Sequence, residues 1–392
     1  MANAEISSGS KINFRIIDWM RGLAALYVLA QHARGYLFAD NVRYEKYIAP
    51  KINWNWRQWL NTLIVQHTNL GKEFVIVFFV LSGFCIMHSV SAEPGGKKGF
   101  FQRRLLRLYP TYLLGIAWAI AVFLILKVTV PDVFNSQTEG YPPLKIAYDA
   151  FVNIKTLSLN LVYFIKDNYL TPQYWSLPLE VIFYLSIPFF ARRFNAYTIF
   201  SIVAFVISCI WTGLDYLDEN KYDGLLVTVR YIFDYNIYFF IGCIFYKYRD
   251  FFLAIFKMDR MRSIVALMLV FLLSVFVKSY LFEQNTNKAT GLLMVLFTYI
   301  MLIAGLKHQV RIKLLEWVGG FSYTLYVSHL ASLFIVKIAV YKMGHHFYDI
   351  FLVYVWYIGV VFAVLVAWLL YYIAEYPSKR YLTQLRNKPT QQ

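Results

Sequence analysis

Charged side chains are scarce in this sequence, where aspartate, glutamate, lysine and arginine make up 15% of 392 residues. A soluble domain usually carries about 25%. Hydrophobic residues reach 59%, and the mean hydropathy is +0.50. A water-soluble core cannot bury this much apolar surface, whereas lipid can. The composition therefore excludes an ordinary soluble enzyme and predicts a single membrane domain.

Cysteine and soluble-enzyme motifs are also lacking. Cys85, Cys209 and Cys243 all lie in apolar runs without metal-like spacing, so we expect neither a disulfide framework nor a metal site. No dinucleotide-binding, P-loop or HExxH pattern has a supporting context. Asp18 and Arg21 interrupt the first apolar stretch, so it is expected to remain as a helix and not to be a cleaved signal peptide.

Long apolar runs are what the sequence does contain. A helix needs about 20 residues to cross the hydrocarbon core of a bilayer. The predicted fold is an all-α bundle of about ten transmembrane helices, at residues 14–38, 72–91, 105–130, 174–191, 197–213, 227–247, 263–282, 289–307, 321–341 and 350–373. Charged and polar residues interrupt the stretch 144–165, which is interpreted as an interfacial or re-entrant helix.

The positions of the basic residues predict the orientation. Lysine and arginine concentrate in cytoplasmic loops. With a cytoplasmic N-terminus, most loop lysines and arginines lie inside and most loop acids outside. The prediction is a domain over 1–392, with a cytoplasmic tail at 1–13, a bundle at 14–373 and a second cytoplasmic tail at 374–392. The net charge of +16 then fits anionic lipid and anionic substrates, not nucleic acid.

Two ionisable residues stand out in the first span. Arg21 and His32 are eleven positions apart, so they share one face of a helix and lie about 16 Å apart along its axis. Ionisable groups inside a membrane usually face the bundle interior. Histidine transfers protons readily near neutral pH, which favours His32 as a general base. The alternative is a structural pair that satisfies neighbouring helices.

Arginines at the start of the third span form a second candidate group. Arg104 and Arg107 are three positions apart and point the same way on a helix. Guanidinium groups match phosphate geometry, so both are candidates for binding an anionic donor. Ordinary positive-inside bias is the alternative.

Other spans also carry polar residues that are candidates for the site. Glu180 is predicted to lie at about the depth of His32, because its span runs inward from the outside. The remaining candidates are Ser82, Trp175, Ser176, Tyr323 and His329. Helix packing and buried hydrogen bonding are the alternatives for Glu180 and His329.

The charged residues of the first and third spans, together with four further sequence motifs, resemble the acyltransferase-3 family of integral membrane acyltransferases along nearly the whole chain. Arg21 and His32 match its basic residue and histidine, and Arg104 and Arg107 match its paired arginines. Its further signatures are matched in order by FFVLSGF (78–84), WSLPLEVIFY (175–184), SYTLYVSH (322–329) and EYP (375–377). One departure is that Glu73 and Phe74 stand where a glycine-valine pair is expected.

The resemblance implies transfer of an acyl group, commonly acetyl from acetyl-CoA, to a hydroxyl of a cell-surface carbohydrate such as O-antigen or exopolysaccharide. It implies a bacterial cytoplasmic (inner) membrane, a catalytic role for the residue matching His32, and a need for Arg104 and Arg107.

The hypothesis is that donor phosphates meet Arg104, Arg107 and Arg21, with Ser82 at the donor site. His32, assisted by Arg21 and oriented by Glu180, deprotonates the acceptor hydroxyl. The acceptor side then comprises Trp175, Ser176, Tyr323 and His329, of which Ser176 or Tyr323 could stabilise the oxyanion.

Two other classes of function compete with this one. A transporter or flippase would use the intramembrane charges to line a path, although no internal symmetry of the kind common in transporters is visible. A non-catalytic scaffold would leave Arg21, His32 and Glu180 without a purpose. A two-step route through an acyl-histidine also stays open. The aromatic residues of loop 40–71 would serve either as an acceptor platform or as an interfacial belt.

Overall fold

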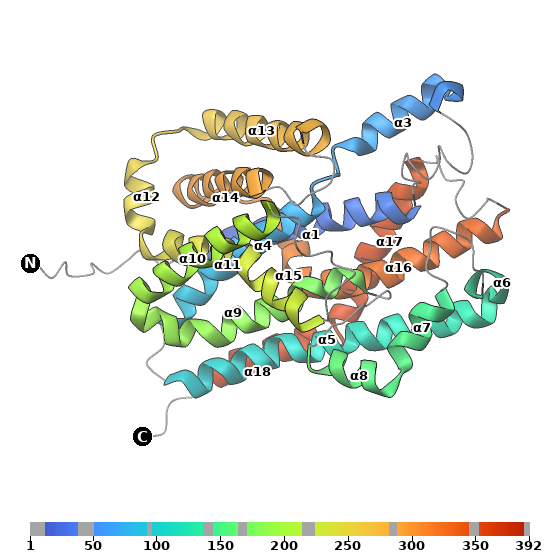
Figure 1. Ribbon diagram of the computed structural model, residues 1–392, viewed down its shortest axis with the longest axis horizontal. Coiled ribbons are helices and arrows are strands. Elements are labelled where there is room, and N and C mark those ends of the chain that lie inside the picture. The colour runs from blue at the N-terminus through green and yellow to red at the C-terminus, as the bar shows by residue number, and fades with distance from the viewer. Residues whose placement is uncertain are drawn as a thin grey trace, which may run out of the picture.

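The computed structural model describes residues 12–37, 51–91, 96–135, 144–163, 171–213, 224–281, 288–344 and 353–387. Most of these residues lie in helices, and no strand occurs among them. Figure 1 shows the long helices running side by side across the molecule. The predicted all-α class is confirmed.

A helix lies in each stretch for which a membrane span is predicted. These helices are α1 (Phe14–Leu37), α4 (Gly71–Ser91), α5 (Gly96–Thr129), α9 (Leu177–Phe190), α10 (Phe194–Gly213), α11 (Gly224–Lys247), α13 (Arg260–Phe276), α14 (Lys288–His308), α16 (Ser322–Lys342) and α17 (Val353–Tyr371). Shorter helices lie between them or after them: α3 (Trp56–Gln66), α6 (Pro131–Phe134), α7 (Leu144–Val152), α8 (Ile154–Leu161), α12 (Arg249–Ile255), α15 (Lys313–Gly320) and α18 (Glu375–Asn387). Single turns occur at η1 (Lys51–Asn53), η2 (Pro172–Ser176), η3 (Ala191–Arg193) and η4 (Val277–Leu281).

Seven helical stretches within the described ranges are long and apolar enough to cross a membrane. They are Gly71–Ser91, Gly99–Thr129, Pro172–Trp211, Arg260–Ser279, Lys288–His308, Ser322–Lys342 and Tyr354–Tyr371, so that α9 and α10 fall in one stretch. Helices α1 and α11, each of 24 residues, are not among the seven, and both carry charged side chains. The chain is thus a polytopic membrane protein, while ten spans and cytoplasmic termini stay predictions.

The interrupted stretch at 144–165 forms two short helices. Asn153 ends α7, and its side chain accepts hydrogen bonds from the backbone N–H groups of Lys155 and Thr156 to start α8. Helices of nine and eight residues are too short to cross the hydrocarbon core. This agrees with the prediction of a segment that does not span the membrane.

Close helix contacts in the bundle depend on glycine. A Cβ atom on Gly83 of α4 would collide with the carbonyl oxygen of Phe239 in α11, and one on Gly319 of α15 would collide with the backbone of Asp18 in α1. Because glycine lacks Cβ, both pairs of helices approach closely. These contacts fix Ser82, beside Gly83, and Arg21, one turn after Asp18, against the centre of the bundle.

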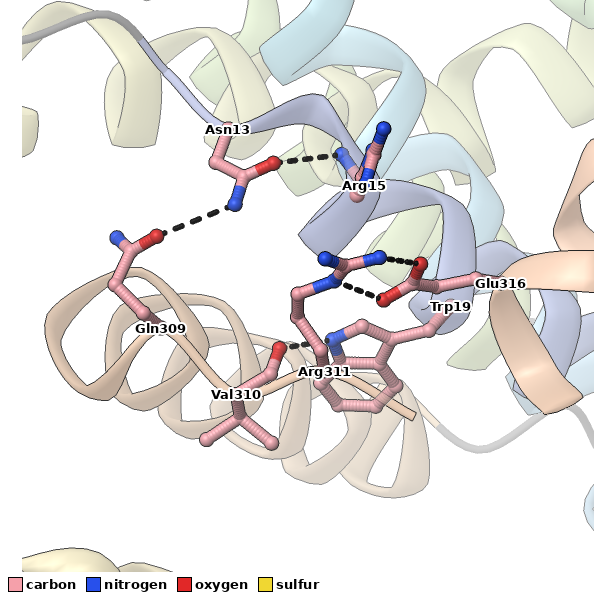
Figure 2. Close-up of polar contacts among 7 residues, drawn as sticks. All are labelled: Asn13, Arg15, Trp19, Gln309, Val310, Arg311 and Glu316. Atoms are coloured by element: carbon pink, nitrogen blue, oxygen red, sulfur yellow. Dashed lines mark hydrogen bonds and ion pairs between the residues drawn. The ribbon is translucent and has the colours of Figure 1, made fainter. Parts of the chain in front are cut away.

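The first residues of α1 are tied to the segment between α14 and α15 (Figure 2). The indole Nε1 of Trp19 donates to the carbonyl of Val310 at 2.9 Å, and Asn13 donates to the side chain of Gln309 at 3.3 Å. Arg311 donates two hydrogen bonds to Glu316, at 2.7 and 2.6 Å. The contacts of Trp19 and Asn13 hold the end of α1 that carries Arg21, and the Arg311–Glu316 pair ties the segment before α15 to that helix.

A network of ion pairs lies near the first residues of α4. The carboxylate of Glu73, only 3% exposed, accepts from Lys278 at 2.7 Å and from Thr290 at 3.3 Å. Asp234 of α11 accepts from Lys288 at 2.5 Å and pairs with Arg230 at 3.8 Å. We call these six residues (Glu73, Lys278, Thr290, Asp234, Lys288 and Arg230) the ion-pair network. Each of its two carboxylates thus has a lysine partner.

The departure from the resembled family pattern at Phe74 has a packing role. Its ring stacks on Tyr27 of α1, with ring centroids 3.8 Å apart, and meets Phe297 of α14 edge-on. An aromatic side chain therefore fills the space that a glycine would leave open between α1, α4 and α14.

Candidate active site

A central cleft lies among eight segments of the bundle (α1, α4, α5, η2, α9, α15, α16 and α18) and holds about 860 Å³ of empty space, part of it open to solvent. It gathers seven of the ten candidate residues from distant parts of the sequence. They are Arg21 of α1, Ser82 of α4, Arg104 and Arg107 of α5, Ser176 of η2, Glu180 of α9 and Tyr323 of α16. Short segments with polar residues, distributed over the chain, thus converge on one site.

A second cavity adjoins the central cleft, and we call it the arginine vestibule. It encloses about 1040 Å³ and is lined by Phe14, Asp18, Arg21, Cys85, His88, Ser89, Phe100, Arg103, Arg104, Arg107, Leu382 and Thr383. Four of these residues (Asp18, Arg21, Arg104 and Arg107) also line the central cleft. The shared residues mark where the two chambers adjoin, which we call the neck, and three of the four are arginines.

The predicted common direction of Arg104 and Arg107 is confirmed, because both side chains line both cavities. Arg104 donates to Ser89 at 2.6 Å, and its guanidinium lies 5.5 Å from the ring centres of Phe100 and Tyr184. Cation–π contacts of this kind hold a guanidinium in place while leaving most of its donors for a ligand.

Glu180 has different partners from the predicted one. Its carboxylate accepts from Ser82 at 3.3 Å and from the hydroxyl of Tyr184, one turn along α9. Its side chain faces the central cleft with Arg21 and Arg104. The prediction that Glu180 orients His32 is therefore wrong, because Ser82 and Tyr184 hold the carboxylate beside the arginines.

His32 pairs with His329, a residue predicted to lie on the acceptor side. Nε2 of His329 lies 3.0 Å from Nδ1 of His32, and Nδ1 of His329 lies 3.0 Å from the carbonyl oxygen of Leu325. His329 is only 1% exposed. The imidazole of His32 therefore points into the bundle, toward α16, and not toward lipid.

Tyr326 stands between the central cleft and the two histidines. It lines the cleft, and its ring centre lies 6.0 Å from that of His329, one turn further along α16. Its hydroxyl contacts Ser176 Oγ at 2.7 Å and donates to the carbonyl of Gln173 at 2.5 Å. Neither His32 nor His329 lines the cleft. In this conformation the cleft therefore ends at Tyr326.

Trp175 is the third candidate that does not line the central cleft. Its ring packs in an aromatic cluster with Phe79, Tyr231 and Tyr235, at centroid distances of 6.5, 5.5 and 5.0 Å. The cluster joins η2 to α4 and α11. The geometry gives Trp175 a packing position next to Ser176.

Helix α18, which falls in the predicted C-terminal tail, contributes two residues to the central cleft. Helix α18 packs along α5 (Figure 1), and Glu375 and Lys379 line the central cleft. Glu375 accepts from the backbone N–H and the hydroxyl of Thr324, at 3.0 and 2.6 Å, and pairs with Lys379 at 2.8 Å. The EYP string marked the first residue of this helix, but no signal identified Lys379.

The aromatic residues of loop 40–71 stay unassigned. Tyr44 and Tyr47 lie outside the described residues, whereas Trp54 is buried and stacks obliquely on Trp59 at 5.0 Å. Trp56 and Trp59 are exposed. Both interpretations, an acceptor platform and an interfacial belt, remain predictions. Within the described ranges, no three His, Cys, Asp or Glu residues are grouped as metal ligands would be.

Comparison with known proteins assigns the chain to a family. Residues 14–372 match the family described as acyltransferase domain. A curated relative, acyltransferase MdmB of Streptomyces mycarofaciens, is 29% identical over 175 residues, which cover 44% of this chain and 38% of the relative. The match thus spans well under half of that relative's length. No solved structure matches the chain. Since the family match covers nearly all of the bundle and the motif residues converge on one site, the chain belongs to the acyltransferase-3 family.

Proposed function

We propose that the chain is a membrane O-acyltransferase that moves an acyl group, acetyl in the first instance, from acyl-CoA to a hydroxyl of an extracytoplasmic carbohydrate. The acceptor would be O-antigen, exopolysaccharide or a similar glycan, and the enzyme would act in a bacterial cytoplasmic membrane. The observation that carries the proposal is the histidine pair one helical turn beyond the end of a cleft lined by arginines.

The contacts of the pair favour one tautomer. The carbonyl of Leu325 only accepts, so Nδ1 of His329 must carry the proton that lies between them. In a neutral ring, Nε2 of His329 then accepts, and Nδ1 of His32 donates to it. Nε2 of His32 is left with its lone pair. A neutral histidine with this nitrogen unprotonated is what a general base requires.

Arginines supply the donor end of the proposed site. The central cleft brings together Arg21, Arg104 and Arg107, whose guanidinium groups are suited to the phosphates of coenzyme A. A thioester is uncharged, so the acyl end would continue past the arginines toward Tyr326. A shift of the Tyr326 ring would then join the cleft to the histidine pair.

Transfer is direct, without an acyl-enzyme. His32 Nε2 takes the proton of the acceptor hydroxyl while its oxygen bonds to the thioester carbonyl carbon. The tetrahedral intermediate collapses by breaking the carbon–sulfur bond, and the departing sulfur takes the proton from His32. The products are the ester and free coenzyme A. The hydroxyls of Ser176 and Tyr323, which line the same cleft, are candidates to stabilise the oxyanion.

His32→Ala in proteoliposomes supplied with acetyl-CoA and glycan acceptor tests the proposal. We expect acetyl transfer to fall by roughly 10²–10⁴-fold, the usual contribution of a general base. His67→Ala, which removes an exposed histidine outside the site, is the control and should keep full activity. Near-normal transfer by the His32 variant would rule out the assignment.

Variants at His329 test the tautomer. A glutamine side chain places a carbonyl oxygen where Nε2 of His329 accepts, whereas alanine removes the acceptor. His329→Gln should therefore keep more activity than His329→Ala, with the difference seen in kcat and not in the KM for acetyl-CoA. Equal losses in both variants, or a loss confined to KM, would contradict a positioning role.

A further inference from the structure

We infer that the arginine vestibule is a separate subsite for the nucleotide half of the donor, with Arg103 binding the phosphate farthest from the thioester. The inference rests on the proposed acyl transfer from coenzyme A, and it assigns the donor's parts to the two chambers. It also distinguishes free coenzyme A from a carrier protein, whose phosphopantetheine arm brings no nucleotide.

Size and continuity give the first argument. The vestibule is open to solvent and holds about 1040 Å³ of empty space, open solvent included, so the bulky end of a ligand can enter it. Along α4, Ser89 lines the vestibule and Phe78 lines the central cleft, and the helical rise between them is about 16 Å. An extended pantetheine arm has a comparable length. Two chambers joined by a neck therefore fit a ligand with a bulky end and a thin arm.

Charge gives the second argument. Among the described residues, four arginines and one acid, Asp18, line the vestibule, whereas three acids and four cations line the central cleft. A strongly cationic chamber favours the part of the ligand that carries most phosphate. In coenzyme A that part is the adenosine 3′-phosphate and the diphosphate. The uncharged pantetheine arm fits the more balanced cleft.

The positions of the arginines separate their roles. Arg104 and Arg107 line both chambers at the neck, where the diphosphate joins the pantetheine arm. Arg103 lines the vestibule and not the cleft. The 3′-phosphate lies beyond the diphosphate as seen from the thioester, so Arg103 is the arginine that can meet it.

Aromatic side chains complete the subsite. The rings of Phe14 and His88 lie on the vestibule wall with centroids 4.9 Å apart, and Phe14 is 37% exposed. A purine can stack on such rings without hydrogen bonds to its ring edges. The adenine is therefore assigned to the side of the vestibule formed by α1 and the end of α4.

Binding of truncated ligands to the full-length protein in detergent tests the inference without an acceptor. Calorimetric titration with coenzyme A, 3′-dephospho-coenzyme A and pantetheine gives three Kd values per variant. For the wild type, loss of the 3′-phosphate should weaken binding by roughly tenfold or more, as expected for a charge-assisted hydrogen bond. Arg103→Ala should weaken coenzyme A binding similarly and leave 3′-dephospho-coenzyme A unchanged.

The ratio of two Kd values within one preparation is independent of the fraction of folded protein. Arg192→Ala, which removes an exposed arginine of η3 outside both cavities, is the matched control and should keep the wild-type ratio. Phe14→Ala should weaken both nucleotide ligands by roughly fivefold or more and leave pantetheine unaffected.

Equal Kd values of the wild type for coenzyme A and its dephospho form would overturn the inference, as would an unchanged ratio in Arg103→Ala. Acetyl transfer measured in parallel separates this from failure of the proposed function. If acetyl transfer is normal but coenzyme A and its dephospho form bind equally well, the proposed function stands and the nucleotide subsite is rejected. If coenzyme A binds more tightly than its dephospho form but no acetyl transfer occurs, the nucleotide subsite stands and the proposed function is rejected.

Discussion

The two ends of α4 carry charges in contrasting arrangements. Near its first residues, Glu73 and Asp234 are each held by lysine at 2.7 and 2.5 Å, within the ion-pair network. Near its last residues, Arg104 bonds to the neutral Ser89, and the vestibule around it has four arginines for one acid. Buried charges are costly unless they are paired. Matched charges suit a structural role, whereas an excess of one sign suits an anionic ligand.

The contrast also shows which charges inside this membrane protein identify the site. Both groups lie in or near apolar helices, and the sequence alone does not rank them. The structure does, because each carboxylate of the ion-pair network is bonded to a lysine, whereas arginines outnumber acids among the described residues that line the vestibule. Changes at the two ends of α4 should therefore give different phenotypes.

The largest effect on stability is expected from Glu73→Gln, which leaves Lys278 without its buried partner. Breaking such a pair costs about 3 kcal/mol, so the Tm in detergent should fall clearly. The double variant Glu73→Gln/Lys278→Gln should recover part of the loss, since no charge is then left unpaired. The Kd for coenzyme A of the folded fraction should not change. A stable Glu73→Gln variant that had lost donor binding would reverse the roles assigned to the two ends.

Arg107→Ala should weaken donor binding without lowering Tm, the opposite of what is expected for Glu73→Gln. The KM for acetyl-CoA is expected to rise by roughly tenfold or more, because a charge-assisted contact to phosphate is lost. The Tm should stay close to that of the wild type or rise, since removal of one cation reduces repulsion with Arg104. Arg230→Ala, in the ion-pair network, is the matched arginine control and should affect Tm without changing KM. A pronounced fall in Tm with an unchanged KM for Arg107→Ala would remove the distinction.

The smallest effect is expected from the ion pair between Arg311, which precedes α15, and Glu316 in that helix. The Arg311 guanidinium, hydrogen-bonded to Glu316, holds the pKa of that carboxyl below its usual range. A lowered pKa in the folded state means that the pair stabilises the protein above the ordinary pKa of glutamate. This stabilisation is lost as the pH falls through the lowered value. The Tm difference between wild type and Glu316→Gln should thus be small at pH 7 and vanish in acid. A difference that grew on acidification would be inconsistent with this pair.

The helices and several site residues were predictable from the sequence. Lipid-sized apolar runs set the positions of the helices, because the hydrocarbon core fixes a span length of about 20 residues. Helical periodicity placed Arg104 and Arg107 on one face, and both line the same cavities. The partners of these residues were not predictable in the same way. Glu180 has the expected helix but binds Ser82 and Tyr184, because the packing of α4 on α9 decided what its carboxylate meets.

The sequence by itself determined that this is an all-α membrane protein of the acyltransferase-3 type, because run length, helical period and motif order are local properties. Only the tertiary structure decided that His32 pairs with His329 and that α18 adds Lys379 to the cleft. It also decided that the arginines form a neck between two chambers. Those outcomes depend on how closely helices pack, which the glycines at 83 and 319 permit but do not specify.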